Sequence, residues 1–212
     1  MKRIVTPGEL VTKEDKKMLS GVYKDAEGIR SEYVGVVYDN DIGIKVVPLK
    51  GKYSPKVGDV IIGKVITDDP FIHLIEVNSH KMGVIPKRTL EGYLNVNDIA
   101  LMRVTVVNEV RDFDLEFMKK LYGGTLLEIS PKKVARVIGK SRSMLEMIQK
   151  YTDTRLSVGG NGLIYVVGGN IALVKEVLEK IEEYSHVDNL TDKIEEFLKS
   201  KTEKKMWWMK LL

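Results

Sequence analysis

The hydrophobic pattern of the chain changes at Tyr122-Gly123-Gly124. Before this point, apolar residues come in short runs separated by glycine, proline, asparagine and aspartate, which is typical of short β-strands joined by turns. After it, strand-like runs alternate with segments whose apolar residues recur every three or four positions, as in amphipathic helices. A chain of 212 residues with this switch predicts two or three small modules rather than one large catalytic barrel.

The composition is that of a globular protein of a reducing compartment. Hydrophobic residues make up 43% and charged residues 30% of the chain, and no apolar run is long enough for a bilayer. The chain has no cysteine, which excludes disulfide frameworks, thiol nucleophiles, iron–sulfur clusters and cysteine-based zinc ribbons. The first residues lack the apolar stretch of a secretory signal. We therefore expect a cytoplasmic protein with no membrane contact.

Two β modules are predicted before the switch. Residues 1–54 are expected to form a small antiparallel β domain, too short to bury a generous core alone. Residues 55–118 contain roughly five short strand runs, with Gly63 and Gly83 inside them, where a small barrel has to bend sharply. This pattern favours a five-stranded OB-type barrel, although a small SH3-like barrel would give a similar pattern.

An α+β module and a helical tail are predicted after the switch. Residues 122–185 contain strand and helix patterns in the order β-α-α-β-β-α. Residues 186–212 are expected to form a helical tail, in which a charged amphipathic helix over 191–205 is followed by an apolar end that contains Trp207-Trp208. This end could pack on the preceding module, contact another subunit or touch a membrane surface. The short, weakly basic apolar stretch disfavours the membrane.

Two glycine-containing motifs carry a resemblance to a known family. The segment from Val137 to Arg142, followed by an amphipathic helix, resembles the signature of a type I KH domain, an apolar pair followed by Gly-x-x-Gly. Arg142 stands where that signature has its second glycine, which lets backbone amides approach phosphates. The tetrapeptide Gly159-Gly160-Asn161-Gly162 resembles the Gly-x-Asn-Gly variety of KH domain found in the RNA-binding cap of the exosome.

The resemblance extends over residues 1 to about 185. The segment from Lys45 to Val65 resembles the junction of an N-terminal domain with an S1 domain in the same family. The chain is therefore similar to archaeal-type exosome cap subunits of the ribosomal-RNA-processing protein four family. Polynucleotide phosphorylase has its KH and S1 modules in the reverse order, behind catalytic domains. The other exosome cap subunit resembles an S1 domain with a zinc ribbon, which a chain without cysteine cannot form.

The resemblance implies a non-catalytic subunit that captures single-stranded RNA. Such subunits, with other cap subunits, form a trimeric ring on a hexameric phosphorolytic exoribonuclease and direct the 3' end of the RNA into its channel. The N-terminal domain would dock on the hexamer. The tetrapeptide at 159–162 would serve at a domain contact rather than read bases. No cofactor is implied.

The candidate RNA-binding residues lie in both RNA-binding modules. In the barrel, Phe71 and His73 alternate along one predicted strand and so share a face, on which Phe71 could stack on a base. The basic candidates of the barrel, which would track phosphates, are Lys64, Lys81, Lys87 and Arg88. In the KH module, the basic candidates that flank the signature loop are Arg136, Lys140 and Arg142. Residues 119–155 carry nine basic and three acidic side chains, so positive charge concentrates around this loop.

Two functions of other classes remain open. The acidic pairs around Asp68 and Asp112 could serve a small metal-dependent nuclease. They fall in predicted turns without a histidine or third acidic residue placed to complete a two-metal site, so no catalytic or metal-binding residue is predicted. The second alternative is a free-standing S1/KH translation or RNA-chaperone factor.

Overall fold

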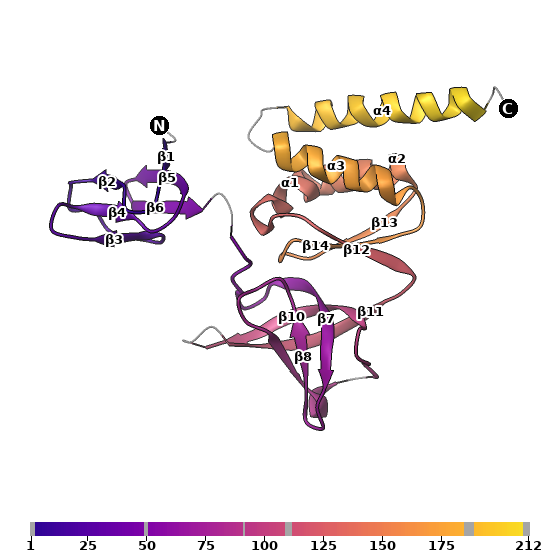
Figure 1. The fold of residues 1–212 in the computed structure, drawn as a ribbon, viewed down its shortest axis with the longest axis horizontal. Coiled ribbons are helices and arrows are strands. Elements are labelled where there is room, and N and C mark those ends of the chain that lie inside the picture. The colour runs from indigo at the N-terminus through magenta and orange to yellow at the C-terminus, as the bar shows by residue number, and fades with distance from the viewer. Residues whose placement is uncertain (1–2, 49–50, 91, 109–111, 185–188, 210–212) are drawn as a thin grey trace. The chain divides into compact units, whose positions relative to one another are not determined.

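The structure, a computed structural model, describes residues 3–48, 51–90, 92–108, 112–184 and 189–209 (Figure 1). From residue 202 onward it describes the backbone only, so the side chains of Trp207 and Trp208 lie outside the described part. The chain divides into two compact units, Met1–Gly51 and Lys52–Leu212.

The first unit consists of two small antiparallel sheets. One has the strand order β1-β5-β6, formed by Arg3–Val5, Gly35–Asn40 and Gly43–Pro48. The other has the order β2-β4-β3, formed by Leu10–Thr12, Ile29–Ser31 and Val22–Lys24. A core of five buried side chains lies within this unit: Val5, Ile29, Val37, Ile44 and Val46. Many apolar side chains stay on its surface, as expected for a unit this small.

A closed five-stranded barrel begins the second unit, as the turn spacing predicted. Its strands are β7 (Val60–Asp68), β8 (Ile72–Glu76), β9 (Gly83–Pro86), β10 (Ile99–Val107) and β11 (Phe113–Leu121). A short 3-10 turn at Lys87–Thr89 follows β9. β11 continues past residue 118, where the sequence pattern ended the barrel, because Lys119 and Lys120 still pair with β10.

An α/β domain of β-α-α-β-β-α order follows, with the element order that the sequence predicted. Its elements are β12 (Gly124–Glu128), α1 (Val134–Ile138), α2 (Ser143–Thr152), β13 (Arg155–Val158), β14 (Leu163–Val167) and α3 (Ile171–Tyr184). The antiparallel sheet has the order β12-β14-β13, which leaves β13 at an edge. The helices pack on one face of the sheet around side chains such as Val137, Ile148 and Val174, all fully buried.

A last helix, α4 (Leu190–Met209), joins the helical layer of the α/β domain. Its buried Leu190, Ile194 and Leu198 belong to the same core as the residues of α1, α2 and α3. Among the described helices, none is long and apolar enough to cross a membrane.

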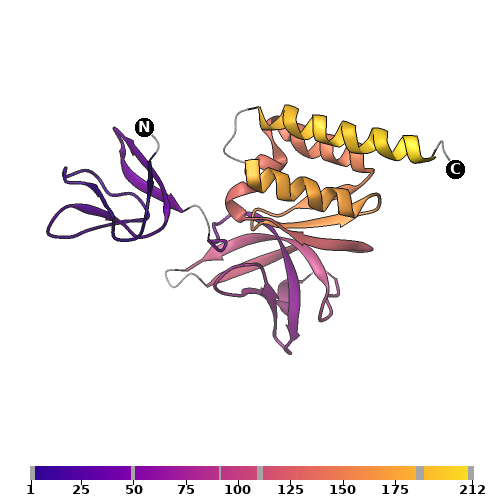
Figure 2. The same ribbon diagram turned by 45° about the horizontal axis from the view of Figure 1, so that its top comes forward.

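The other face of the three-stranded sheet packs against the barrel. Figure 2 shows the sheet between the helices and the barrel strands, so this unit has three layers. Buried Ile62 of β7 meets buried Leu163 and Tyr165 of β14, and partly buried apolar side chains of both modules surround them. We call this contact the junction.

Asn161 forms the polar centre of the junction. It is fully buried. Its side-chain Oδ1 accepts a hydrogen bond from the backbone N–H of Ile62 at 3.2 Å. Its Nδ2 donates to the backbone oxygens of Ile62 at 2.7 Å and Val77 at 2.8 Å. In the β7–β8 ladder, Lys64 pairs with Glu76, which is the last pair at this end. If the ladder continued in the same register, Ile62 would lie opposite Asn78. The Asn161 amide therefore satisfies peptide groups just where the β7–β8 ladder ends.

The glycines beside Asn161 allow this approach. The N–H of Gly160 donates to the Val60 oxygen at 2.8 Å, so the turn also bonds to the barrel through its backbone. A Cβ atom on Gly159 would collide with Asn161 Oδ1 and would lie 2.7 Å from the Ile62 nitrogen. Gly162 has φ +85°, in the left-handed region that favours glycine. The structure thus explains why positions 159, 161 and 162 hold glycine, asparagine and glycine.

Replacement of Asn161 by alanine is expected to weaken the junction. Asn161→Ala removes three hydrogen bonds and leaves buried peptide groups of Ile62 and Val77 without partners. Because such groups are costly to bury unpaired, we expect the free energy of unfolding to fall by about 2–4 kcal/mol, measured by urea denaturation. Exposed Asn95→Ala is the control, and equal losses in both variants would contradict the role of Asn161.

The two neighbouring glycines are expected to differ in their tolerance of a methyl group. Gly159→Ala should lower the free energy of unfolding by about 1–3 kcal/mol because its Cβ has no room. Gly160→Ala, whose nearest neighbour would be the Val60 oxygen at 3.4 Å, should change it by less than about 0.5 kcal/mol. Thermal denaturation of the two variants measures the difference in stability. Similar melting temperatures would show that the junction can shift to make room for a methyl group at position 159.

Candidate nucleic-acid interface

Two aromatic rings project from one end of the barrel. Phe71, in the turn before β8, is 80% exposed, and Tyr93, in the loop before β10, is 91% exposed. The backbone beneath Phe71 is held on both sides: its N–H donates to Asp69 Oδ1 at 3.0 Å, and its oxygen accepts the Lys87 N–H at 2.9 Å. The ring is thus exposed on a backbone fixed by hydrogen bonds.

A cavity of about 300 Å³ lies beside the Tyr93 ring. Tyr93, His73 and Lys87 contribute to its lining, together with the loop at 92–95. Exposed Arg88 follows Lys87 in the 3-10 turn. We call the set Phe71, His73, Lys87, Arg88 and Tyr93 the aromatic end of the barrel. It combines aromatic surface with positive charge, as single-stranded nucleic acid requires.

The strand predicted to carry Phe71 and His73 begins one residue later in the structure, after Phe71. β8 begins at Ile72, and the hydrogen bond to Asp69 places Phe71 in the preceding turn. Within β8, the alternation puts His73 on the same side as buried Ile75, and His73 is only 2% exposed. His73 therefore belongs to the wall of the cavity, whereas Phe71 projects into solvent.

The basic candidates of the barrel do not form one groove. Lys87 and Arg88 lie near Phe71, at the end of the β8–β9 hairpin where Ile72 pairs with Pro86. Lys81 precedes the opposite end of this hairpin, and its ammonium donates to the Asp112 carboxylate at 2.6 Å. Lys64 lies in mid-strand opposite Glu76. The structure thus brings Phe71, Lys87 and Arg88 together and separates Lys81 from them.

Tyr93 is a residue that the sequence analysis missed. It lies in a loop without strand periodicity, and an isolated tyrosine there gives no pattern to detect. The available signal was its position after Gly92 in a loop, since loops usually run over the surface. Its exposure, the highest among the large apolar side chains described, marks it in the structure.

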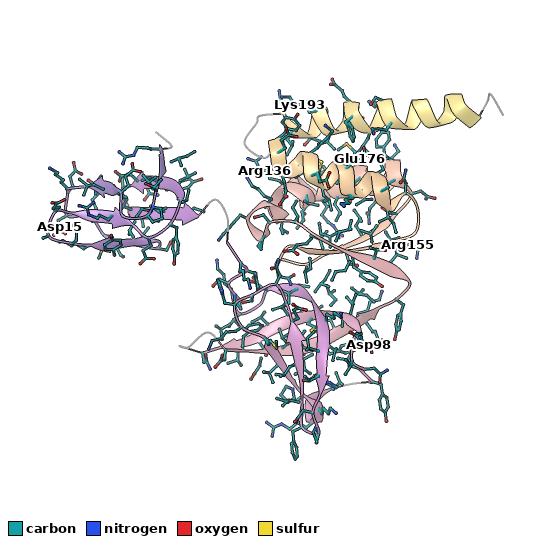
Figure 3. The ribbon with its side chains drawn as sticks, in the orientation of Figure 1. Asp15, Asp98, Arg136, Arg155, Glu176 and Lys193 are labelled. Atoms are coloured by element: carbon teal, nitrogen blue, oxygen red, sulfur yellow. The ribbon has the colours of Figure 1, made fainter. Side chains whose placement is uncertain are left out.

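The loop between α1 and α2 keeps a glycine-like backbone despite its arginine. Gly139 has φ +73°, Ser141 has φ +51° and Arg142 has φ +68°. Arg142 therefore adopts the left-handed conformation that a glycine at this position would adopt. The side chains of Arg136, which belongs to α1 (Figure 3), and of Lys140 and Arg142 in the loop are exposed.

The carboxylates that suggested a nuclease have structural partners. The Asp69 carboxylate accepts a hydrogen bond from the Phe71 N–H. The Asp112 carboxylate accepts one from the Lys81 ammonium, and the Asp112 backbone N–H donates to Asn108 Oδ1. The hydrogen bond from Lys81 lowers the pKa of the Asp112 carboxyl. The side chain of Asp68 lies outside the described part of the structure. Within the described residues, no group of three histidine or acidic side chains could hold a metal ion.

Comparison with known proteins identifies the family. No protein-family model matches the chain. Exosome complex component Rrp4 of Picrophilus torridus is 33% identical over 213 residues, which cover 93% of each chain. The chain belongs to the Rrp4 family of exosome components. Rrp4 of Thermoplasma acidophilum is 35% identical over 94% of this chain and 91% of its own.

A solved structure extends the comparison from sequence to fold. The crystal structure of a protein assigned as an exosome complex RNA-binding protein superimposes with a TM-score of 0.65. It is 25% identical in sequence and aligns with 73% of this chain and 99% of its own.

The strained loop of this Rrp4 family member gives a stability test. Arg142→Gly should raise the free energy of unfolding by up to about 1 kcal/mol, because the left-handed conformation costs about 1–2 kcal/mol for a residue with a Cβ, partly offset by the greater freedom of glycine in the unfolded chain. Arg142→Val should lower it, since a β-branched side chain tolerates positive φ poorly. Urea midpoints measure both, and a loss on Arg142→Gly would mean that the guanidinium stabilises the loop.

Proposed function

We propose that this chain is a non-catalytic RNA-binding cap subunit of an exosome complex, whose barrel end binds single-stranded RNA. Its relatives of similar length are named exosome complex components. We assign residues 55–118 as an S1 domain, 122–185 as a type I KH domain, 1–54 as a docking domain and 186–212 as a helical tail. The observation that carries the RNA-binding part is the aromatic end of the barrel.

Exposed aromatic rings favour RNA over other ligands. The Phe71 and Tyr93 rings leave most of their apolar surface in water. A flat base that stacks on a ring would remove this surface from water. Lys87 and Arg88 beside them supply the charge that a phosphate backbone needs. Stacking is tolerant of base identity, which suits a subunit that passes many different RNAs to an enzyme.

The loop between α1 and α2 supplies a second contact with the RNA backbone. Arg136, Lys140 and Arg142 are exposed and close together in sequence, and guanidinium groups bind phosphate oxygens bidentately. Ser141 and Arg142 have a left-handed backbone, so the loop keeps a conformation that usually favours glycine.

The first unit supplies the docking surface in this proposal. Its small core leaves apolar side chains exposed, among them Ile4 at 62% and Ile42 at 69%. Such surface is typical of a protein interface. We place this unit against a hexameric phosphorolytic core in the cytoplasm. Together with other cap subunits, the whole chain would form a trimeric ring that directs the 3' end of the RNA into the channel of the hexamer.

RNA binding by the full chain tests the barrel assignment. Phe71→Ala and Tyr93→Ala should each weaken binding of a single-stranded oligoribonucleotide by about 1–3 kcal/mol, the contribution of one stacked base. Tyr23→Ala removes an exposed tyrosine of the first unit and serves as the control in a fluorescence-anisotropy titration. Unchanged affinity in both barrel variants would reject the aromatic end as the RNA site. The RNA should be recovered intact with magnesium and phosphate present, and cleavage would reject the non-catalytic function.

Association with the phosphorolytic hexamer tests the docking assignment. Deletion of residues 1–51, a compact unit with its own core, should abolish co-elution with the hexamer in gel filtration. Ile42→Asp should weaken co-elution by placing a charge on the proposed surface. Val57→Asp, at a similarly exposed position of the second unit, should leave it unchanged. Co-elution of the truncated chain would show that another surface makes the contact.

A further inference from the structure

An exposed aromatic ring lies on the connection between the barrel and the α/β domain. Tyr122 and Gly123 alone join β11 to β12, and Tyr122 is 69% exposed. The backbone is held on both sides of the ring: Leu121 packs into the apolar part of the junction, and the Gly124 N–H donates to the Tyr165 hydroxyl at 2.9 Å. The Tyr122 ring therefore projects into solvent from a fixed backbone, and the aromatic end of the barrel does not include it.

Lys120 covers one face of this ring. Its ammonium lies 5.2 Å from the centre of the Tyr122 ring, within the range of a cation–π contact. The same ammonium forms an ion pair with the Asp98 carboxylate, and both side chains are mostly buried, with 17% and 19% of their surface exposed. The hydrogen bond with Asp98 raises the pKa of Lys120, so the lysine stays charged and neutralises the carboxylate. Because Asp98 holds Lys120 in place, the lysine fixes the ring and leaves its other face open.

The same ion pair connects Tyr122 to the loop that carries Tyr93. The Asp98 carboxylate accepts a hydrogen bond from the Asn95 N–H at 2.6 Å, which closes the end of this loop. Leu94 is buried in the barrel core and anchors the loop, while its neighbour Tyr93 is exposed. Consecutive contacts thus lead from the Tyr122 ring through the ion pair to the loop of Tyr93. Tyr122 extends the aromatic end toward the α/β domain.

The charges around Tyr122 favour a polyanion over a protein partner. Lys119, three residues before Tyr122, is exposed, and so is Arg155 at the start of β13. Arg155 and Gly124 both pair with Val167, so Arg155 belongs to the row of the sheet in which β12 begins, two residues after Tyr122. An open ring face flanked by positive charge is the combination with which proteins bind single-stranded nucleic acid.

We propose that the open face of Tyr122 stacks on one base of single-stranded RNA, and that Lys120 is the positioning residue that holds the ring for it. This rests on the proposed function and adds a base site between the barrel and the α/β domain, separate from Phe71 and Tyr93. The base and the ammonium take opposite faces of the ring, so binding leaves the ion pair with Asp98 intact. One RNA strand thus stacks on Tyr93 and Tyr122 in succession.

Removal of the ring should weaken RNA binding, whereas removal of its hydroxyl should not. Tyr122→Ala should weaken binding of a long oligoadenylate to the full chain by about five-fold to 150-fold, the contribution of one stacked base, measured by fluorescence anisotropy. Tyr122→Phe keeps the stacking face and should bind as the unaltered chain does. An equal loss in the two variants would overturn the proposal, because Tyr122→Phe still offers the ring.

A tyrosine in a similar setting provides the matched control. Tyr38 is also exposed, and the Lys45 ammonium lies 5.5 Å from the centre of its ring, but this pair belongs to the first unit. Tyr38→Ala should leave the affinity for the long oligoadenylate unchanged. A loss equal to that of Tyr122→Ala would show that any exposed ring with a lysine on one face has this effect, and would overturn the assignment to Tyr122.

The length of the oligoadenylate separates this site from the aromatic end. Affinity for the unaltered chain should rise with length until both sites are filled. In Tyr122→Ala the rise should end at shorter oligoadenylates, and in Phe71→Ala the gain from Tyr122 at longer lengths should persist. If Tyr122→Ala binds every length as the unaltered chain does, the ring holds no base, and the proposed function stands on the aromatic end alone. If the unaltered chain binds no RNA, both proposals fail.

Removal of the ion pair tests the positioning role of Lys120. The double variant Asp98→Asn/Lys120→Met loses one charge of each sign, so the net charge of +4 stays the same. It should weaken binding of the long oligoadenylate by about two-fold to five-fold while Tyr122 is present. In the Tyr122→Ala background the loss should be smaller, because only the loop of Tyr93 is still affected. Equal losses in both backgrounds would overturn the positioning role.

Crosslinking locates the base without any variant. A series of oligoadenylates, each with one 4-thiouridine at a different position, is irradiated with the unaltered full chain. At least one member should attach to the tryptic peptide 121–132, in which Tyr122 is the only aromatic residue. Attachment confined to the peptides of Phe71 and Tyr93 would overturn the proposal and leave the proposed function in place.

Discussion

One buried amide holds the barrel and the α/β domain together. The side chain of Asn161 replaces the missing rung at the end of the β7–β8 ladder, so it satisfies peptide groups of the barrel that would otherwise be buried without partners. Apolar contact between Ile62, Leu163 and Tyr165 supplies area but no direction. The three hydrogen bonds supply the direction, because they fix the position of β14 relative to β7.

The positions of both candidate RNA sites depend on this junction. The aromatic end belongs to the barrel, and the loop between α1 and α2 belongs to the α/β domain. The packing around Asn161 therefore sets the distance between them. The turn that carries Asn161 is short and joins β13 directly to β14. A shift at the turn would therefore move the edge strand β13.

The sequence predicted the elements better than the site. Strands β13 and β14 and helix α3 follow the predicted patterns because their apolar periodicity is regular. The β-α-α-β-β-α order and the closed barrel follow for the same reason. Periodicity cannot show that the Phe71 N–H donates to the Asp69 side chain, which places Phe71 in the turn before β8. Lys81 looked available for phosphate because its partner, Asp112, is distant in sequence. The exposure of Tyr93 depends on where its loop lies, and the junction depends on two modules meeting. A linear pattern encodes neither.

In the loop after α1, the backbone determines the shape and a side chain supplies the charge. Ser141 and Arg142 already lie in the left-handed region, so the path of the chain does not require a glycine at position 142. The curvature of the loop is thus carried by main-chain torsions, and its electrostatic potential by a side chain that points away from the core. In such an arrangement the strength with which the loop attracts a polyanion can be adjusted by one substitution while the geometry presented to it stays the same.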